Sequence, residues 1–244
     1  AAGVLEQIGD GVATDLEVGD HVMAIVVPNG SHGAYAEHLV VPIESVARVP
    51  KGASDPEAAT LPMNALTARM ALDILDLKPG QTLLVTGAAG ALGGYAIQLA
   101  KAEGLRVVAD TSEKDESLVK ALGADVVVRR GESFASRVRQ EVGPGADAVI
   151  DGAVLNEQVV GALRDGGRMV TVRGYEGDQP GITYLPIFVR NYAREQAKLD
   201  RLRQQVEDGT LTLRVARTFP AEQAAEAHRL LEAGGTRGRI ILEF

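Results

Sequence analysis

The chain contains no cysteine among its 244 residues. This absence excludes disulfide bonds, thiolate catalysis and every zinc site that needs a thiolate ligand. It is compatible with a reducing compartment, and we expect a cytoplasmic protein. No uninterrupted apolar run reaches the length of a membrane-spanning helix, so no membrane partner is expected.

Positive charge is also scarce. Lysine and arginine number 25 against 33 aspartates and glutamates, which gives a net charge of -8 and makes a nucleic-acid partner unexpected. The 28 glycines follow no three-residue period, which excludes collagen. Signal peptide and initiator methionine are absent, and the opening Ala1-Ala2-Gly3 is already typical of a strand. We therefore expect an N-terminally incomplete chain.

The first third of the sequence predicts a β-rich region. Residues 1–50 are typical of short strands separated by glycine turns, with strand candidates at Val22–Val27 and Ala34–Pro42. The S-x-x-E spacing that starts at Ser54 indicates a capping box. A helix is expected soon afterwards over Asn64–Leu75.

From residue 82 onward the pattern alternates between strand and helix. The predicted strands are Thr82–Thr86, Arg106–Ala109, Val126–Val128, Ala148–Ile150 and Arg168–Val172. The predicted helices lie near 91–102, 114–122, 133–142 and 156–163. This alternation predicts an α/β fold with a doubly wound parallel sheet buried on both faces.

The remaining elements are a sixth strand and a C-terminal segment. Ile182–Val189 is the candidate sixth strand, interrupted by Pro186. A charged helix is predicted at Ala193–Asp208, and a strand, a helix at Ala221–Ala233 and a last strand at Arg239–Phe244 follow it.

A glycine-rich turn between the strand Thr82–Thr86 and the next helix is the strongest functional signal. Such a turn allows close backbone approach, and the helix N-terminus attracts a pyrophosphate. Ala88 replaces the first glycine of the usual pattern, and Asp110 follows Gly90 at the spacing of a ribose-binding acid. Plain packing is the alternative role. The residues expected to bind a dinucleotide here are Gly87, Ala88, Ala89, Gly90, Ala91, Leu92 and Gly93.

Several further motifs accompany this loop in a fixed order. They are Val18-Gly19-Asp20-His21-Val22, Gly33-Ala34-Tyr35-Ala36-Glu37, Ala59-Thr60-Leu61-Pro62 with Leu66-Thr67-Ala68, Leu122-Gly123-Ala124-Asp125, Gly166-Gly167-Arg168 and Gly238-Arg239-Ile240-Ile241-Leu242. With them the chain resembles the zinc-free quinone oxidoreductase (zeta-crystallin-like) branch of the medium-chain dehydrogenase/reductase superfamily.

The resemblance implies two lobes. It places a partial GroES-like lobe at 1–62, a Rossmann domain at 63–190 and a return to the first lobe at 191–244. The family lobe normally starts several dozen residues earlier and includes a tyrosine beside the nicotinamide, which this chain lacks. The zinc branch of the family needs cysteine ligands, so no metal is expected. The four histidines, His21, His32, His38 and His228, are read as ordinary polar residues.

The choice between NAD and NADP is a conflict within the sequence. Asp110 favours NAD(H), because a carboxylate accepts from the ribose 2′-hydroxyl and repels a 2′-phosphate. Arg130 favours NADP(H), since arginine suits a phosphate and falls beside the 2′-phosphate pocket implied by the resemblance. Asp110 can instead pair with a neighbouring cation, and Arg130 can be one of two solvated surface charges. We favour NADP(H), with further contacts from Thr111, Ser112 and Lys114.

The resemblance also implies residues around the nicotinamide. They are Asn64 and Thr67, then Asp151, Gly152 and Ala153, and then Arg173 and Gly174. Phe188 and Val189 are expected on the far side of the cleft, and Arg237 near the C-terminus is a further candidate. Each has a structural alternative: Asn64 can cap a helix, Thr67 can be a buried hydroxyl and Asp151 can start a helix. Tyr35 is interpreted as lobe packing.

No triad, pair of catalytic carboxylates or activated lysine can be assembled by spacing, so the catalytic residues stay unassigned. The resemblance implies a zinc-independent enzyme that transfers hydride from NADPH to a quinone or an α,β-unsaturated carbonyl. The alternatives are a non-catalytic NADPH-binding protein and an enoyl-reductase unit. A homodimer is expected through residues 182–189, whose apolar side chains lie at a sheet edge.

Overall fold

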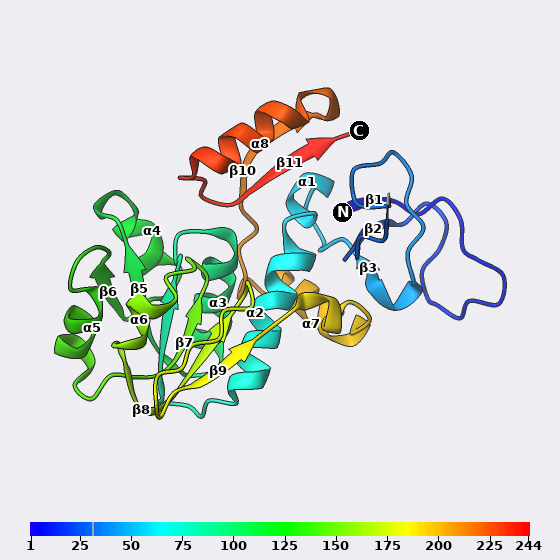
Figure 1. The fold of residues 1–244 in the computed structure, drawn as a ribbon. Coiled ribbons are helices and arrows are strands. Elements are labelled where there is room, and N and C mark those ends of the chain that lie inside the picture. The colour runs from blue at the N-terminus through cyan, green and yellow to red at the C-terminus, as the bar shows by residue number, and fades with distance from the viewer. Residues whose placement is uncertain (31) are drawn as a thin grey trace. The chain divides into compact units, whose positions relative to one another are not determined.

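The computed structural model of the protein describes residues 1–30 and 32–244. The chain divides into two compact units (Figure 1). One unit contains residues 1–66 together with 189–244, and the other contains residues 67–188.

A six-stranded parallel sheet forms the centre of the second unit. Its strands, in chain order, are β4 (Thr82–Thr86), β5 (Arg106–Thr111), β6 (Val126–Arg129), β7 (Ala146–Asp151), β8 (Leu163–Thr171) and β9 (Thr183–Pro186). Their order across the sheet is β6-β5-β4-β7-β8-β9. This order confirms the predicted doubly wound fold.

Both faces of the sheet are covered, as the central strand β4 shows most clearly. Leu83, Leu84 and Val85 have no exposed surface, because consecutive side chains of a parallel strand point into two covered faces. Helices flank the sheet (Figure 1). They are α3 (Ala91–Ala102), α4 (Glu116–Ala121) after a short 3-10 turn, α5 (Phe134–Val142) and α6 (Glu157–Val160).

The strand order places a topological switch point beside β4. The chain leaves β4 for β5 on one side and later returns to β7 on the other side. In doubly wound sheets, ligands bind outside the carboxyl ends of the strands at such a point. The last paired residues there are Thr86 of β4 and Asp151 of β7.

The opposite, amino-terminal ends of these strands are braced by Asp147. Its carboxylate accepts hydrogen bonds from the Thr82 backbone N–H at 2.7 Å, from Gln81 Nε2 at 3.0 Å and from Arg164 Nε at 2.8 Å. Burial works against the charged form, but these hydrogen bonds together outweigh burial and lower the pKa of Asp147.

The other unit contains a small antiparallel sheet of β1 (Ala2–Val4), β2 (His21–Ala24) and β3 (Val46–Arg48). Leu16, Ala24 and Val46 form its buried apolar cluster. Gln196, the first residue of helix α7 (Gln196–Glu207), donates to the carbonyl oxygens of Ile43 and Val46. The segment after residue 189 is thereby tied to the first sheet.

Three further helices, one of them only in part, and a strand pair complete this unit. The predicted capping box is confirmed at α1 (Asp55–Ala58), where the Glu57 carboxylate accepts from the backbone N–H and the hydroxyl of Ser54. Helix α2 (Leu61–Leu75) starts here and continues into the second unit. Near the C-terminus, β10 (Val215–Pro220) and β11 (Arg239–Glu243) pair in parallel around α8 (Ala224–Ala233).

The predicted strand at Ala34–Pro42 is wrong. No residue in this range is in a strand. Tyr35 is 60% exposed and Val40 is fully exposed, so these side chains cover no sheet face and the backbone has no ladder to join. Their β-favouring residue types were the only strand signal.

The predicted strand Ile182–Val189 is shorter in the structure. β9 ends at Pro186, and Val189 begins a 3-10 turn. Ile187 is only 2% exposed, so its own chain covers it, whereas Phe188 is 46% exposed. The homodimer through this sheet edge stays a prediction.

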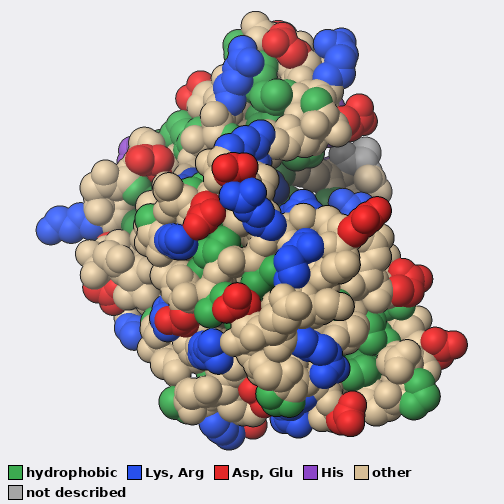
Figure 2. Space-filling model, turned by 90° about the vertical axis from the view of Figure 1, so that its left-hand side faces the viewer, with side chains coloured by type: hydrophobic (Ala, Val, Ile, Leu, Met, Phe, Trp, Pro, Cys, Tyr) green, Lys and Arg blue, Asp and Glu red, His purple; other side chains and the backbone are tan. Residues whose placement is uncertain are grey.

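The surface carries charges of both signs. Figure 2 shows acidic and basic side chains interspersed over the face drawn, without a broad area of one sign. Among the described residues, no helix combines the length and the apolar character needed to cross a bilayer.

The Asp147 brace can be tested by Asp147→Asn. The amide removes the charge that three donors share, so the free energy of unfolding in urea should fall by about 1.5–3 kcal/mol at pH 7. Because the folded pKa is lowered, this stabilisation is complete above the ordinary value of 3.8 and is lost as pH falls below it. The difference in the free energy of unfolding between wild type and variant should therefore disappear at acidic pH. Asp165→Asn, at an exposed neighbour, is the control; equal losses in both variants would contradict the assignment.

Candidate dinucleotide-binding site

The loop after β4 requires glycine at two positions for steric reasons. Gly87 has a φ of +68°, and a Cβ there would lie 3.0 Å from the carbonyl carbon of Gly152. A Cβ on Gly93 would collide with the Gly87 carbonyl oxygen. The first turn of α3 therefore packs directly on the end of β4.

Gly90 is different, because its backbone does not need glycine. Its φ of -74° and ψ of 176° suit any residue, and a Cβ there would meet only the Gly87 carbonyl oxygen, at 3.0 Å. Gly90 is the N-cap of α3, where backbone N–H groups and the helix dipole favour an anion. The lack of a side chain therefore keeps this end of the helix accessible.

Ala88 takes the place of the usual first glycine without disturbing the loop. Its side chain is fully buried, and its backbone N–H donates to Asp110 Oδ1 at 3.0 Å. Ala89 and Gly90 follow it, and Ala91 and Leu92 open the helix, all with partly exposed surface. The residues present thus form a cradle that fits a dinucleotide pyrophosphate.

Asp110, near the end of β5, lies inside the protein beneath this loop. Its side chain has no exposed surface. Besides the bond from Ala88, its Oδ2 accepts from Arg130 Nε at 2.8 Å and lies 2.6 Å from Arg130 Nη2. Burial raises the pKa of Asp110, and the Ala88 hydrogen bond and the charge of Arg130 oppose this rise.

Arg130 follows β6 and remains half-exposed, with 49% of its side chain accessible. Its backbone N–H donates to the Thr111 carbonyl at 3.0 Å. Arg137 of α5 donates to the carbonyls of Arg129, at 2.7 Å, and of Glu132, at 2.5 Å. The sequence analysis did not single out Arg137. Its position near the start of the predicted helix after this loop was the one feature that indicated a contact with the loop.

A second buried carboxylate, Asp151, flanks β4 on the other side. Thr86 Oγ1 donates to Asp151 Oδ1 at 2.5 Å and accepts from the Ala153 backbone N–H at 3.0 Å. Asp151 also accepts from the backbone N–H groups of Leu155, at 3.1 Å, and Asn156, at 2.8 Å. Thr86, which sequence reasoning missed, is a polar residue ending an otherwise apolar strand.

The loop that Asp151 holds has an unusual backbone. Val154 and Asn156 have φ angles of +56° and +53°, although neither is glycine. Such angles cost on the order of 1–3 kcal/mol each, most clearly for a β-branched residue. A Cβ on Gly152 would lie 2.8 Å from the Thr86 carbonyl oxygen, so this loop and the glycine loop are in backbone contact.

The structure places the other predicted residues of this unit as follows. Thr111 is buried at the end of β5, Ser112 donates to Asp115, and Lys114 is exposed. Arg173 and Gly174 follow the carboxyl end of β8 and are exposed. The Phe188 ring lies 3.8 Å from where a Cβ of Gly174 would be.

The remaining predicted residues lie on α2 or in the first unit. Asn64 and Thr67 are one turn apart on α2, and Asn64 Nδ2 is a buried donor with no hydrogen-bond partner among residues 1–30 and 32–244. Val189 begins a 3-10 turn, and Arg237 Nη1 donates to the Thr236 carbonyl.

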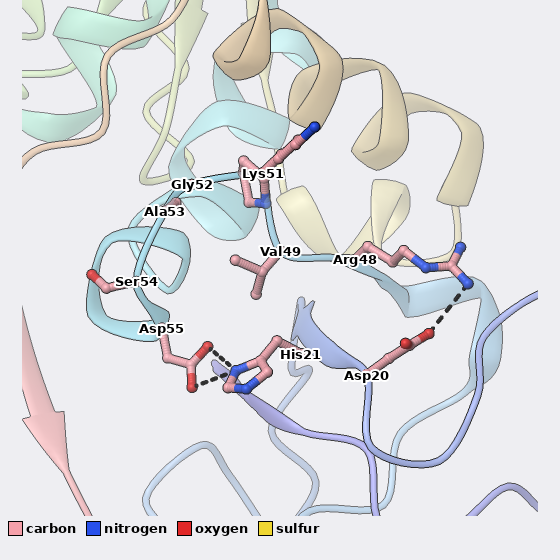
Figure 3. A pocket seen from close by; sticks show the side chains of 10 residues that line it. Asp20, His21, Arg48, Val49, Lys51, Gly52, Ala53, Ser54 and Asp55 are labelled. Atoms are coloured by element: carbon pink, nitrogen blue, oxygen red, sulfur yellow. Dashed lines mark hydrogen bonds and ion pairs between the residues drawn. The ribbon is translucent and has the colours of Figure 1, made fainter.

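A hollow in the first unit is lined by none of these residues. It measures about 600 Å³ and is lined by residues 20–21 and 48–55 (Figure 3). Four of its side chains form two pairs: His21 Nδ1 lies 2.9 Å from Asp55 Oδ1, and Arg48 Nη2 lies 3.2 Å from Asp20 Oδ2. It contains none of the predicted site residues.

The histidines lie in separate surroundings. His38 pairs with Glu6, and His228 Nε2 lies 3.0 Å from the hydroxyl of the exposed Tyr35. In the part of the chain that the structure describes, no three histidine, aspartate or glutamate side chains are grouped so that they could hold a metal. With no cysteine in the sequence, these residues do not fit a zinc site.

The fold and the glycine loop together define a doubly wound unit of the Rossmann type. The family model "Zinc-binding dehydrogenase" matches residues 122–242. A probable zinc-binding oxidoreductase, mitochondrial, from Arthroderma benhamiae is 30% identical over 89% of this chain and 71% of its own length. The chain therefore belongs to the zinc-binding dehydrogenase family. This family is part of the medium-chain dehydrogenase/reductase superfamily, so the superfamily that the motifs predicted is confirmed.

Other relatives differ in length and in described activity. Polyketide synthase GfsB of Streptomyces halstedii is 33% identical over 99% of this chain. The chain spans only 4% of that synthase and 7% of the polyketide synthase component PikAII of Streptomyces venezuelae. A probable quinone oxidoreductase of Schizosaccharomyces pombe is 27% identical over 99% of this chain and 78% of its own length.

Solved structures share the fold over nearly the whole chain. An NAD-dependent alcohol dehydrogenase has a TM-score of 0.85 at 32% identity, covering 100% of this chain and 81% of its own. Mycobacterial Rv1454c complexed with NADPH has a TM-score of 0.86 at 28% identity, covering 99% of this chain and 80% of its own. The CurK enoyl reductase has a TM-score of 0.84 at 25% identity, covering 99% of this chain and 77% of its own.

Gly90→Asp tests the cradle. We expect loss of dinucleotide binding in a folded protein, because the side chain occupies the N-terminus of α3 and its charge repels a pyrophosphate. Calorimetric titration with NADPH measures the affinity, and thermal unfolding checks the fold. Gly33→Asp is the matched control, because Gly33 has a negative φ and no atom of the described residues lies within 4 Å of where its Cβ would be. An unchanged affinity for NADPH in a folded Gly90→Asp variant would contradict the assignment of the pyrophosphate site to this loop.

Proposed function

We propose that the chain binds NADP(H) and transfers hydride to a quinone or an α,β-unsaturated carbonyl compound without zinc. The observation that carries the proposal is the glycine loop at the switch point, bonded to the buried Asp110, which in turn is paired with the half-exposed Arg130. The NADPH complex of a structural relative supports this cofactor, and the NAD-dependent relative keeps NAD(H) as the alternative.

Each part of the cofactor has candidate residues in this chain. The first turn of α3 would hold the pyrophosphate, and Arg130 would hold the adenosine 2′-phosphate, with Lys114 as a second cation. Asn64 and Thr67 are proposed for the nicotinamide end. The buried and unpartnered Nδ2 of Asn64 supports this role, because an unsatisfied buried donor is costly unless a ligand completes it.

The bound nicotinamide supplies the hydride that the side chains of this protein cannot provide. The work of the chain is to hold cofactor and substrate close and aligned, which accounts for a large part of the barrier reduction in such reactions. Asp110 and Asp151 fix the loops that perform this alignment. No side chain is assigned as the proton donor, and water or a nearby hydroxyl can supply the proton.

An enoyl-reductase unit is the second candidate for the same chemistry. Its support is the match to polyketide synthases over 99% of this chain and the fold shared with an enoyl reductase. Both candidates reduce a polarised double bond, but an enoyl reductase takes its substrate as a thioester. The two candidates therefore differ in whether the substrate site must accept an acyl group attached to a carrier through a thioester.

A comparison of substrates tests the proposal. The loss of NADPH absorbance is followed with a simple benzoquinone, with an enone and with crotonyl thioester. We expect turnover of the quinone or the enone. Turnover of the thioester alone would favour the enoyl-reductase unit. NADPH binding without turnover of any substrate would make this a non-catalytic binding protein.

Arg130→Ala tests the cofactor choice. We expect NADPH binding to weaken about ten-fold more than NADH binding, because a charge-assisted phosphate contact is lost. Arg129→Ala is the control, since Arg129 is adjacent, 60% exposed and paired only loosely, at 3.3 Å, with Glu113. Equal weakening of both cofactors, or the same result for Arg129→Ala, would contradict a 2′-phosphate contact at Arg130.

A further inference from the structure

The carboxylate of Asp110 is turned inward, onto groups of its own chain. Oδ1 accepts from the Ala88 backbone N–H, and both contacts from Arg130 fall on Oδ2. The side chain is completely buried beneath the glycine loop. The usual reason why an acid at this position selects NAD, an outward carboxylate that binds the ribose, therefore does not apply to this conformation.

Arg130 turns one edge inward and leaves the other outward. Its Nε and Nη2 groups face Asp110, and an arginine guanidinium has five N–H donors. Half of the side chain is accessible, so the outer edge can meet an anion. The charge of Arg130 is, however, already balanced by the buried carboxylate directly behind it.

The position of Arg130 does not depend on Asp110 alone. Its backbone N–H is bonded to the Thr111 carbonyl, and Arg137 holds the carbonyls of Arg129 and Glu132 on either side. Removing only the charge of Asp110 should therefore change the electrostatics of this end of the site more than its geometry.

We propose that Asp110 is a specificity-determining residue whose buried carboxylate balances Arg130 and thereby limits the preference for NADPH over NADH. This inference rests on the proposed function, since it assumes that a nicotinamide dinucleotide binds at the glycine loop. The phosphate of NADPH meets a neutral pair instead of a free cation, so the chain accepts both cofactors. The acid acts through Arg130 and does not touch the ribose.

Asp110→Asn separates charge from shape. The amide oxygen can still accept from Ala88, but the negative charge behind Arg130 is gone. We expect the ratio of the Kd for NADH to the Kd for NADPH to rise by about ten-fold, mainly through tighter NADPH binding, because one repulsive charge near a dianion is removed. Calorimetry or the fluorescence of the bound reduced cofactor measures both constants without turnover.

A second variant and a control complete the experiment. Asp110→Thr also removes the charge and keeps a hydroxyl acceptor on a β-favouring residue, so its ratio should rise as well. Asp147→Asn neutralises a carboxylate at the opposite ends of the strands and should leave the ratio unchanged. If wild type binds both cofactors and neither Asp110 variant raises the ratio, this inference is wrong. If wild type binds neither cofactor, the proposed function itself is wrong.

Discussion

The hydrogen bonds of one buried carboxylate connect the glycine loop with Arg130. Asp110 accepts from the backbone of the glycine loop with one oxygen and from Arg130 with the other. A buried charge without such partners is strongly unfavourable, so the loop N–H and the guanidinium are held where they lie. The conformation of the glycine loop and the charge balance of Arg130 therefore depend on the same side chain.

The central strand β4 has a buried acid on each side. Asp110 belongs to β5 and Asp151 to β7, the two neighbours of β4 in the sheet. Each carboxylate accepts from backbone N–H groups of a loop that leaves a carboxyl end. Asp110 thus fixes the backbone of the glycine loop, and Asp151 fixes the loop after β7 beside it. Gly87 and Gly93 lack the side chains that would separate the glycine loop from its neighbours. Such preorganisation suits a reaction that depends on alignment.

The sequence predicted the alternating unit well, because apolar strands between glycine turns and helices have a strong local signal. It predicted β4 and α3 with their observed bounds. It failed at Ala34–Pro42, where strand-forming residue types have no partner strand to pair with. The sequence could not predict which way the Asp110 side chain points. Residue spacing predicts only that an acid lies at the end of this strand. The burial of Asp110 and its contact with Arg130 depend on the neighbouring strand. The same holds for Thr86 and Arg137, whose roles arise from contacts between segments distant in sequence.

A crystal structure of the chain grown with NADPH tests the central claim most directly. The account predicts the pyrophosphate at the first turn of α3, the adenosine 2′-phosphate within hydrogen-bonding distance of Arg130, and Asp110 still bonded to the Ala88 backbone. A 2′-phosphate held away from Arg130, or an Asp110 carboxylate turned outward onto the ribose, would contradict it.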